Sequence, residues 1–277
     1  MSECTHNCDT CGANCGSKEA NISKLKLGIG SKIKKIIGVS SGKGGVGKSF
    51  VTSLLAAGLQ KKGYKVGILD ADVLGPSIPK SFGIIDKNVV ANENNLMEPK
   101  VSRLGLKIIS SNLLLEDDTK PIIFRGSLIS GVLQQFYQET NWGELDFLFI
   151  DMPPGTGDVP LTVYQSIPID KVIIVTSPQD LVSMIVGKSI NMANEMNIDI
   201  MGVIENMSYV VCPNCETHIE IFGKSKLDKV VDDNDTIALA KLPMRVEYSK
   251  MVDEGMVEDI DIVELDSTIS KLEELVK

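Results

Sequence analysis

The stretch that decides the fold reads IIGVS at residues 36–40 and continues as SGKGGVGKS at residues 41–49. Residues 42–49 satisfy the phosphate-binding pattern G-x-x-x-x-G-K-[ST], between a strand-like run and a helix-forming run. Glycines let successive backbone N–H groups converge on phosphate oxygens, and the following helix N-terminus adds its dipole. We expect Lys48 to reach the β- and γ-phosphates and the Ser49 hydroxyl to bind Mg²⁺. The predicted nucleotide cradle consists of Gly42, Lys43, Gly44, Gly45, Val46, Gly47, Lys48 and Ser49.

Short apolar runs alternate with helical stretches through the rest of the chain. The runs typical of buried strands are 36–40, 65–69, 106–110, 147–150, 172–176, 200–204 and 238–242. The main helical stretches are 48–62, 126–140, 180–196 and 264–276. Because crossovers between parallel strands are right-handed, this order predicts an α/β fold with a doubly wound, mostly parallel sheet covered on both faces. Segment 86–103 is polar and stays unassigned.

Three regions are predicted along the chain. Residues 1–21 contain no Val, Ile, Leu or aromatic side chain, so we expect a mobile cysteine-rich arm unless a metal folds it. Residues 22–35 form a lysine-rich lead-in, and residues 36–277 are expected to form a single P-loop ATPase domain.

Three carboxylates stand at the ends of predicted strands. Asp70 and Asp72 lie in LDADVLGPS at residues 69–77, and Asp151 ends the run FLFID at residues 147–151. The C-terminal ends of parallel strands gather ligand groups at one edge of the sheet. An apolar strand ending in one carboxylate is the Walker B pattern, which predicts that Asp151 holds Mg²⁺. The alternative for Asp70 or Asp72 is a turn or helix cap.

The lysine at position 43 distinguishes this phosphate-binding loop from the general pattern. GKGGVGKS resembles the deviant Walker A loop of the MinD/ParA/nitrogenase-iron-protein class of P-loop proteins. The resemblance implies that Lys43 contacts the nucleotide of a partner subunit, where a cation supplied in trans stabilises charge on the transferring phosphoryl group. It also implies that Asp72 orients the attacking water and that Asp70 lies near the metal. A solvated loop charge is the alternative reading of Lys43.

The nucleotide base is predicted from positions shared with the same class. The sequence contains no Asn-Lys-x-Asp guanine motif. Asn206 and Pro243 match the positions that contact adenine in the class, so the resemblance favours ATP over GTP.

The six cysteines fall into two groups. Cys212 and Cys215 form a C-x-x-C loop that supplies two thiolates, half of what a tetrahedral zinc or a four-iron cluster needs. The other half would come from the N-terminal group or from the same pair in a second subunit. The N-terminal group, spaced C-x₃-C-x₂-C-x₃-C, consists of Cys4, Cys8, Cys11 and Cys15.

The ligand of the N-terminal group stays open between a second cluster, a zinc ion, and a redox or unliganded arm. His6 and His218 are candidate zinc ligands, and an ordinary surface histidine is the alternative for each.

Taken together, the motifs resemble the Mrp (ApbC-like) family of iron–sulfur cluster carrier ATPases. The matching stretches are GKGGVGKS (42–49), LDADVLGPS (69–77), FRG (124–126), IDMPPGTGD (150–158), IENMSYVVCPNC (204–215) and IFG (221–223). The resemblance implies a homodimer that holds a [4Fe–4S] cluster between Cys212 and Cys215 of both subunits. It also implies slow ATP hydrolysis and delivery of the cluster to recipient apoproteins, with cluster-assembly scaffolds as further partners. The arm departs from the family, because its cysteine spacing is neither the bacterial ferredoxin run nor the wider spacing of eukaryotic relatives.

Charge and composition argue against several other functions. A formal net charge of −9 disfavours binding to nucleic acid or to an anionic membrane. The sequence has no apolar run of about 18 residues and no apolar signal segment at its start. These features predict a cytoplasmic protein, in which cysteines are metal ligands or redox groups rather than disulfides.

Three rival functions share the nucleotide site. A MinD/ParA-like positioning ATPase would need a basic amphipathic tail, whereas residues 262–276 are amphipathic and acidic. An electron-transfer ATPase like the nitrogenase iron protein carries its cluster cysteines far apart in sequence, not as C-x-x-C. A zinc-stabilised nucleotide-binding scaffold is the third alternative, and metal content distinguishes it from a cluster carrier.

Overall fold

A central β-sheet organises the molecule. The computed structural model describes residues 24–73, 75, 77–86, 88–114, 126–179, 182–212 and 214–277. In these residues nine strands form one sheet in the order β3-β4-β2-β5-β1-β6-β7-β8, with β9 paired to β7. The strands are β1 Lys32–Ser40, β2 Val66–Asp70, β3 Lys100–Val101, β4 Lys107–Ser110, β5 Glu144–Asp151, β6 Lys171–Thr176, β7 Asp199–Val211, β8 His218–Ile219 and β9 Ala238–Pro243. Only the short β3 and β8 pair antiparallel to their neighbours.

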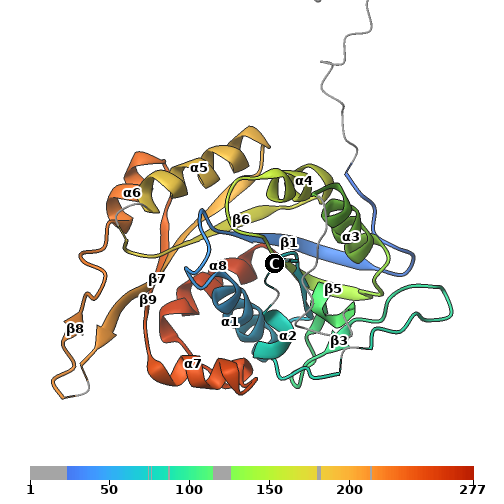
Figure 1. Ribbon diagram of the computed structural model, residues 1–277, viewed down its shortest axis with the longest axis horizontal. Coiled ribbons are helices and arrows are strands. Elements are labelled where there is room, and N and C mark those ends of the chain that lie inside the picture. The colour runs from blue at the N-terminus through green and yellow to red at the C-terminus, as the bar shows by residue number, and fades with distance from the viewer. Residues whose placement is uncertain are drawn as a thin grey trace, which may run out of the picture.

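Helices cover both faces of the sheet (Figure 1). They are α1 Lys48–Lys61, α2 Ile78–Ser81, α3 Gly126–Gln138, α4 Asp158–Ser166, α5 Val182–Glu195, α6 Leu227–Asp233, α7 Val246–Asp253 and α8 Asp266–Glu274. Short 3₁₀ turns lie at Ser111–Leu114, Val257–Asp259 and Val263–Leu265. Helices α3, α4, α5 and α6 lie above the sheet in Figure 1, and α1, α2, α7 and α8 lie below it. This three-layered arrangement confirms the predicted doubly wound α/β fold.

The core lies on the two faces of the sheet because the central strands are aliphatic on both sides. In β1, Ile36 packs into the cluster under α3, α4 and α5, whereas Ile37 and Val39 pack into the cluster around α1. Burial of both faces is what parallel sheets require.

The parallel register brings the functional strand ends together. Strand β5 pairs with both β1 and β2, which places Asp151 opposite Val39 on one side and opposite Asp70 on the other. The phosphate-binding loop follows β1 directly. The predicted gathering of strand ends at one edge is therefore present.

Several elements differ from the sequence prediction. Strand β7 was expected over 200–204 but continues to Val211, and β1 begins at Lys32, inside the expected lead-in. Leu25 and Leu27 pack against the core, and the Leu25 amide donates a hydrogen bond to the Ser166 carbonyl at the end of α4. The lead-in is thus joined to the domain. The elements without a predicted counterpart are α2, α4, α6, α7, β3 and β8.

Some predicted features lie outside the described residues. They are Cys4, Cys8, Cys11, Cys15 and His6 of the arm, Phe124 and Arg125 of the FRG stretch, and the first two residues of the helix expected at 180–196. Across the part of the chain that is described, no helix has the length and apolar character needed to cross a membrane.

Candidate functional site

The phosphate-binding loop connects β1 to α1 and depends on its glycines. Gly45 and Gly47 adopt left-handed conformations with φ of 80° and 81°, which side chains with a Cβ rarely adopt. A Cβ on Gly47 would lie 2.1 Å from the Asn206 side-chain nitrogen. Helix α1 starts at once, since the Val51 amide bonds to the Gly47 carbonyl at 3.0 Å. The loop has the backbone shape and the helix N-terminus that a phosphate site needs.

Lys48 and Asp151 form a buried ion pair at the centre of this edge. The Lys48 ammonium lies 2.7 Å from Asp151 Oδ2, and the two side chains are 6% and 0% exposed. The Ser49 hydroxyl donates to Asp151 Oδ2 at 2.6 Å, and the Thr52 hydroxyl donates to Oδ1 at 2.7 Å. Lys48, the predicted phosphate ligand, and Ser49, a predicted Mg²⁺ ligand, thus both bond to Asp151, another predicted Mg²⁺ ligand. Thr52 is not among the residues predicted from the sequence, and the signal that could have identified it is a hydroxyl one turn after Lys48.

Asp70 is the second buried carboxylate of this edge. It accepts hydrogen bonds from the Ser110 hydroxyl at 3.0 Å and from the Asp72 amide at 3.2 Å. Burial, reinforced by the neighbouring Asp151 charge and partly offset by Lys48, raises the pKa of Asp70 to about 7. Asp72 itself is half-buried at the start of the following loop. Carboxylates and a hydroxyl are the hard oxygen donors that Mg²⁺ prefers, so this donor set fits the predicted metal.

The loop after Asp151 is fastened to the phosphate-binding loop. The Gly155 amide donates to the Ser41 carbonyl at 2.8 Å, and residues 153–157 lead directly into α4. Lys43 is half-exposed, and its ammonium contacts the side-chain oxygen of Gln179. Its predicted contact with a partner's nucleotide therefore stays a prediction.

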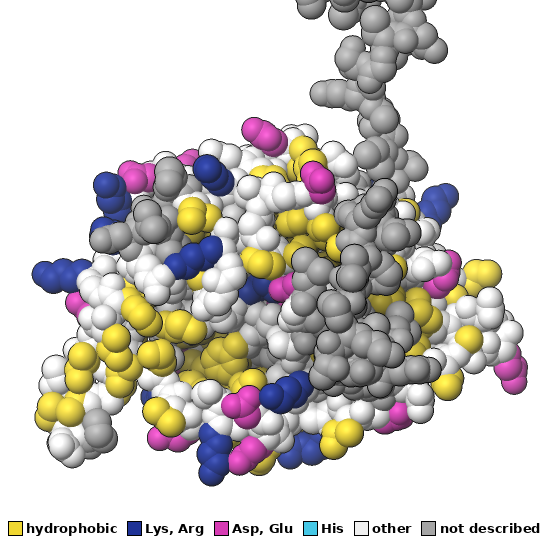
Figure 2. Space-filling view, in the orientation of Figure 1, with side chains coloured by type: hydrophobic (Ala, Val, Ile, Leu, Met, Phe, Trp, Pro, Cys, Tyr) yellow, Lys and Arg dark blue, Asp and Glu magenta, His cyan; other side chains and the backbone are white. Residues whose placement is uncertain are grey.

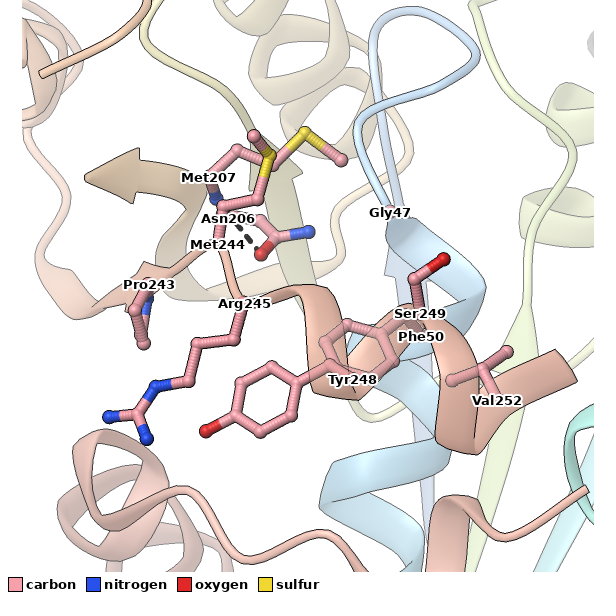
Figure 3. Close-up of a pocket in the computed structure, with 10 residues that line it drawn as sticks. All are labelled: Gly47, Phe50, Asn206, Met207, Pro243, Met244, Arg245, Tyr248, Ser249 and Val252. Atoms are coloured by element: carbon pink, nitrogen blue, oxygen red, sulfur yellow. Dashed lines mark hydrogen bonds between the residues drawn. The ribbon is translucent and has the colours of Figure 1, made fainter. Parts of the chain in front are cut away.

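A cavity of about 300 Å³ adjoins Gly47 and is mostly apolar. Asn206 and Pro243 both line it, as Figure 3 shows. The Asn206 amide group donates to the Val46 carbonyl at 3.0 Å and accepts from the Met207 amide at 2.9 Å. The size and lining suit a planar heterocycle beside the phosphate-binding loop. The other lining residues, which the sequence analysis missed, are Phe50, Met207, Met244, Arg245, Tyr248, Ser249 and Val252.

The aromatic wall of this cavity comes from two helices. The rings of Phe50 on α1 and Tyr248 on α7 lie 6.0 Å apart, and the Arg245 guanidinium lies 5.5 Å from the Tyr248 ring centroid. No short motif marks these residues, because α7 reaches the site only through tertiary packing.

Cys212 and Cys215 lie in the turn of a β-hairpin formed by β7 and β8. The hairpin projects from the body at the left of Figure 1, and Figure 2 shows hydrophobic side chains gathered along it. Cys212 is half-buried, Cys215 is exposed, and both are free thiols. The Cys212 amide donates to the Thr217 carbonyl at 2.9 Å. The Cys215 thiol lies 3.3 Å from the Thr217 hydroxyl.

These contacts favour the thiolate form of Cys215. Hydrogen bonds from Thr217, followed by one with Cys212, lower the pKa of the Cys215 thiol, and the thiolate is the form that binds metals. The exposed His218 ring stacks on the Tyr209 ring with centroids 4.0 Å apart, and its role as a zinc ligand stays a prediction. Among the described residues no group of three or more His, Cys, Asp or Glu side chains is arranged to hold a metal. The hairpin therefore presents two free thiols, Cys212 and Cys215.

The parallel sheet, the glycine cradle and the buried Lys48–Asp151 pair define a P-loop nucleotide-binding protein. The family model ParA, described as NUBPL iron-transfer P-loop NTPase, matches residues 32–276. The chain belongs to this family of iron-transfer P-loop NTPases.

Individual relatives agree with this assignment. The iron-sulfur cluster carrier protein of Clostridium perfringens is 43% identical over 258 residues, which cover 91% of this chain and 90% of the relative. A nucleotide-binding protein from Archaeoglobus fulgidus, solved in complex with ADP, is 41% identical with a TM-score of 0.76, covering 84% of this chain and 91% of its own. The cell division ATPase MinD of Pyrococcus furiosus, at 18% identity and a TM-score of 0.61, covers 87% of this chain and 98% of its own. At that identity the MinD likeness concerns the fold alone.

Proposed function

We propose that this chain is an iron–sulfur cluster carrier whose loading and delivery are coupled to ATP. The observation that carries the proposal is the free thiol pair, Cys212 and Cys215, on a projecting hairpin that continues the strand lining the base pocket. The iron-sulfur cluster carrier relatives at 43% and 44% identity support it. The cargo is a [4Fe–4S] cluster, and the recipients are apoproteins that lack one.

The cluster is held between two copies of the chain. A cubane cluster bound by cysteine needs four thiolates, and one hairpin provides two. A homodimer with a two-fold axis brings two identical hairpins together without any further ligand. Such a shared site can release its cargo when the subunits rearrange. The half-site geometry of the Cys212–Cys215 hairpin supports this arrangement.

The nucleotide is ATP with Mg²⁺. Ser49, Asp151 and Asp70 would hold the metal, which neutralises charge on the β- and γ-phosphates. Lys48 leaves Asp151 to bind the phosphates, and Asp72 orients the attacking water. Lys43 stabilises charge on the nucleotide of the partner subunit. Hydrolysis is expected to be slow, because it serves one transfer event per dimer rather than steady turnover.

Base recognition uses the apolar cavity beside Gly47. Asn206 forms a polar edge of the cavity and Pro243 a rigid edge. Phe50 and Tyr248 form its aromatic wall. We assign adenine to this cavity. The cytoplasm, where thiols stay reduced, is the compartment that this chemistry requires.

Metal analysis after anaerobic purification tests the proposal. The expected result is a brown protein that contains iron and acid-labile sulfide and restores activity to an apoprotein that needs a [4Fe–4S] cluster. A colourless protein that contains zinc and no sulfide would instead support a zinc-stabilised nucleotide-binding scaffold. The ligand of the four arm cysteines stays a prediction, because they lie outside the described residues.

A further inference from the structure

Strand β7 carries a large bulge between the base pocket and the cysteine hairpin. Glu205 pairs with Lys241 of β9, and the next pair is Tyr209 with Pro243. An advance of four residues along β7, from Glu205 to Tyr209, is therefore paired with an advance of only two residues along β9. Within the bulge Met207 adopts a left-handed backbone with φ of 58°. This conformation is uncommon for a long side chain, and such outliers gather at functional sites.

The bulge is itself a wall of the base pocket. Asn206 and Met207 line the cavity from β7, and Pro243 and Met244 line it from β9 (Figure 3). The Asn206 side chain also bonds to the Val46 carbonyl of the phosphate-binding loop at 3.0 Å. A base that enters the cavity must contact the segment from which the hairpin departs.

Tyr209 is the first residue beyond the bulge, and it contacts both sides. Its carbonyl accepts a hydrogen bond from the Met244 amide at 2.8 Å. Its ring stacks on the His218 ring with centroids 4.0 Å apart and planes inclined by 10°. Its hydroxyl donates to Glu264 at 3.1 Å, which ties it to the C-terminal part of the chain.

The contacts of Tyr209 continue to the cysteines. His218 pairs with Val211 next to Cys212, and it directly follows Thr217. Thr217 bonds to the Cys212 amide through its carbonyl and lies 3.3 Å from the Cys215 thiol through its hydroxyl. An unbroken series of contacts thus leads from Met244 in the pocket wall to the Cys212 backbone and the Cys215 thiol.

We propose that Tyr209 is a positioning residue that transmits occupancy of the base pocket to the Cys212–Cys215 hairpin, which turns about the bulge at Met207. The inference rests on the proposed function, in that it names how nucleotide binding controls the cargo site. Nucleotide bound in the pocket shifts Met207 and Met244. Tyr209 moves with the Met244 amide to which it is bonded. His218, which stacks on Tyr209, then moves the turn of the hairpin that holds the cysteines. Because such coupling is reciprocal, metal held by the thiols changes nucleotide affinity by the same factor.

Pulsed alkylation tests this coupling without any cluster. The full-length protein, reduced and freed of metal with a chelator, is treated briefly with iodoacetamide in the presence or absence of MgADP. Peptide mass spectrometry then gives the reaction rates of Cys212 and Cys215 separately from those of the arm cysteines. In the wild type we expect MgADP to change the Cys215 rate by about fivefold or more, the low end of measured couplings.

Two variants and one control identify the path. Tyr209→Leu and His218→Ala should bind ADP and lose the effect of MgADP on the Cys215 rate. Ile219→Ala changes an exposed neighbour of His218 on β8 and should keep the full effect. If Tyr209 and His218 had a purely structural role, their replacement would alter the Cys215 alkylation rate without ADP but leave the response of that rate to MgADP intact. Since His218 is exposed, its replacement leaves the fold intact even if Tyr209→Leu does not fold.

The outcomes separate this inference from the proposed function. An equal response to MgADP in wild type and both variants, or no response in the wild type, overturns the role of Tyr209. A response that follows the expected pattern in a protein that never acquires iron would uphold the coupling and refute the carrier function.

Discussion

The phosphate-binding loop and the cysteine hairpin extend from the same sheet, but their side chains are held differently. At the loop, Lys48 and Asp151 are buried and bonded to each other, and the Ser49 and Thr52 hydroxyls occupy both oxygens of Asp151. In the hairpin, every residue from 214 to 224 is exposed. In one region the side chains are bonded to one another within the core, and in the other two free thiols stand on a projecting hairpin, Cys215 exposed and Cys212 half-buried.

The difference indicates where each site obtains its stability. Polar groups in the loop are positioned by the core beneath them, so nucleotide binding exchanges one set of bonds for another. In the proposed carrier, the hairpin would gain order from a bound cluster and from the second copy that completes the ligand set. Substitution of the buried Lys48 should therefore alter stability and catalysis together, whereas substitutions in the hairpin should remove cargo and leave the fold intact.

The largest effect is expected from Cys212→Ala. Each hairpin then keeps only the Cys215 thiolate, and the two thiolates per hairpin pair are half of the four that hold a cubane, so transfer of iron and sulfide to an apoprotein should fall to background. ATP binding by the metal-free proteins, measured by calorimetry, should stay as in the wild type. The matched control replaces Cys4, Cys8, Cys11 and Cys15 by Ala, and this variant should keep cluster transfer. Loss of ATP binding in Cys212→Ala would show that the two regions do not fold separately.

Lys48→Ala should damage both catalysis and stability. Removing the cation leaves Asp151 as a buried, unpaired carboxylate, which lowers the free energy of unfolding by about 3–5 kcal/mol. ATP hydrolysis should fall by about 10²-fold or more, because the cation on the transferring phosphoryl group is lost. Denaturant titration and a phosphate-release assay measure the two effects.

Lys43→Ala is the control for Lys48, since Lys43 is half-exposed and pairs with no carboxylate among the interactions described. Its unfolding free energy should change by less than about 0.5 kcal/mol, while hydrolysis falls because the partner's nucleotide loses its cation. A Lys43→Ala protein with normal hydrolysis would refute the role of this lysine in trans.

Asp72→Asn should slow hydrolysis by about 10²–10⁴-fold, the range for loss of a general base or water-orienting group. ATP affinity should remain close to that of the wild type, because the carboxylate acts on water and not on the nucleotide. Calorimetry with ATP and single-turnover hydrolysis separate these effects. If affinity falls as much as it does in Lys48→Ala, Asp72 is instead a metal ligand or a structural residue.

The smallest effect is expected from Asp70→Asn, which should raise the stability of the nucleotide-free protein where Lys48→Ala lowers it. Burial beside Asp151 raises the pKa of Asp70, so its charge destabilises the nucleotide-free fold near neutral pH. Asp70→Asn removes the charge and keeps groups able to bond Ser110 and the Asp72 amide. We expect the melting temperature without nucleotide to rise by about 2–4 °C and the stabilisation by Mg²⁺ with ATP to shrink. A lower melting temperature without nucleotide would contradict the repulsion between the two carboxylates.

The sequence predicted those parts of the fold and site that depend on local pattern. The loop at residues 42–49 and the carboxylates Asp70 and Asp151 are each marked by the strand that precedes them, and the structure brings them together. The C-x-x-C loop is likewise visible in the sequence. The spacing of Cys212 and Cys215 does not predict that the hairpin projects from the sheet.

The remaining parts depend on tertiary packing. Tyr248 and Arg245 reach the base pocket only because α7 follows β9 at that edge. Strand β7 was expected to end at residue 204, since Glu205, Asn206 and Ser208 interrupt its apolar pattern. All three polar side chains have partners: the Ser208 hydroxyl donates to the Glu205 carboxylate at 2.8 Å, and the Asn206 side-chain amide donates to the carbonyl of Val46, far away in the sequence, at 3.0 Å. Hydrogen bonds that satisfy polar side chains within a strand leave no periodic pattern in the sequence, so the longer strand could not be predicted.

The most direct test of the account is native mass spectrometry of the reconstituted variant in which the four arm cysteines are Ala. A cluster shared between two hairpins requires a dimer that carries one cluster, four iron and four sulfide per two chains. Cys212→Ala in the same background should give protein without a cluster. A single chain that carries a complete cluster, or a Cys212→Ala dimer that keeps one, would contradict the account.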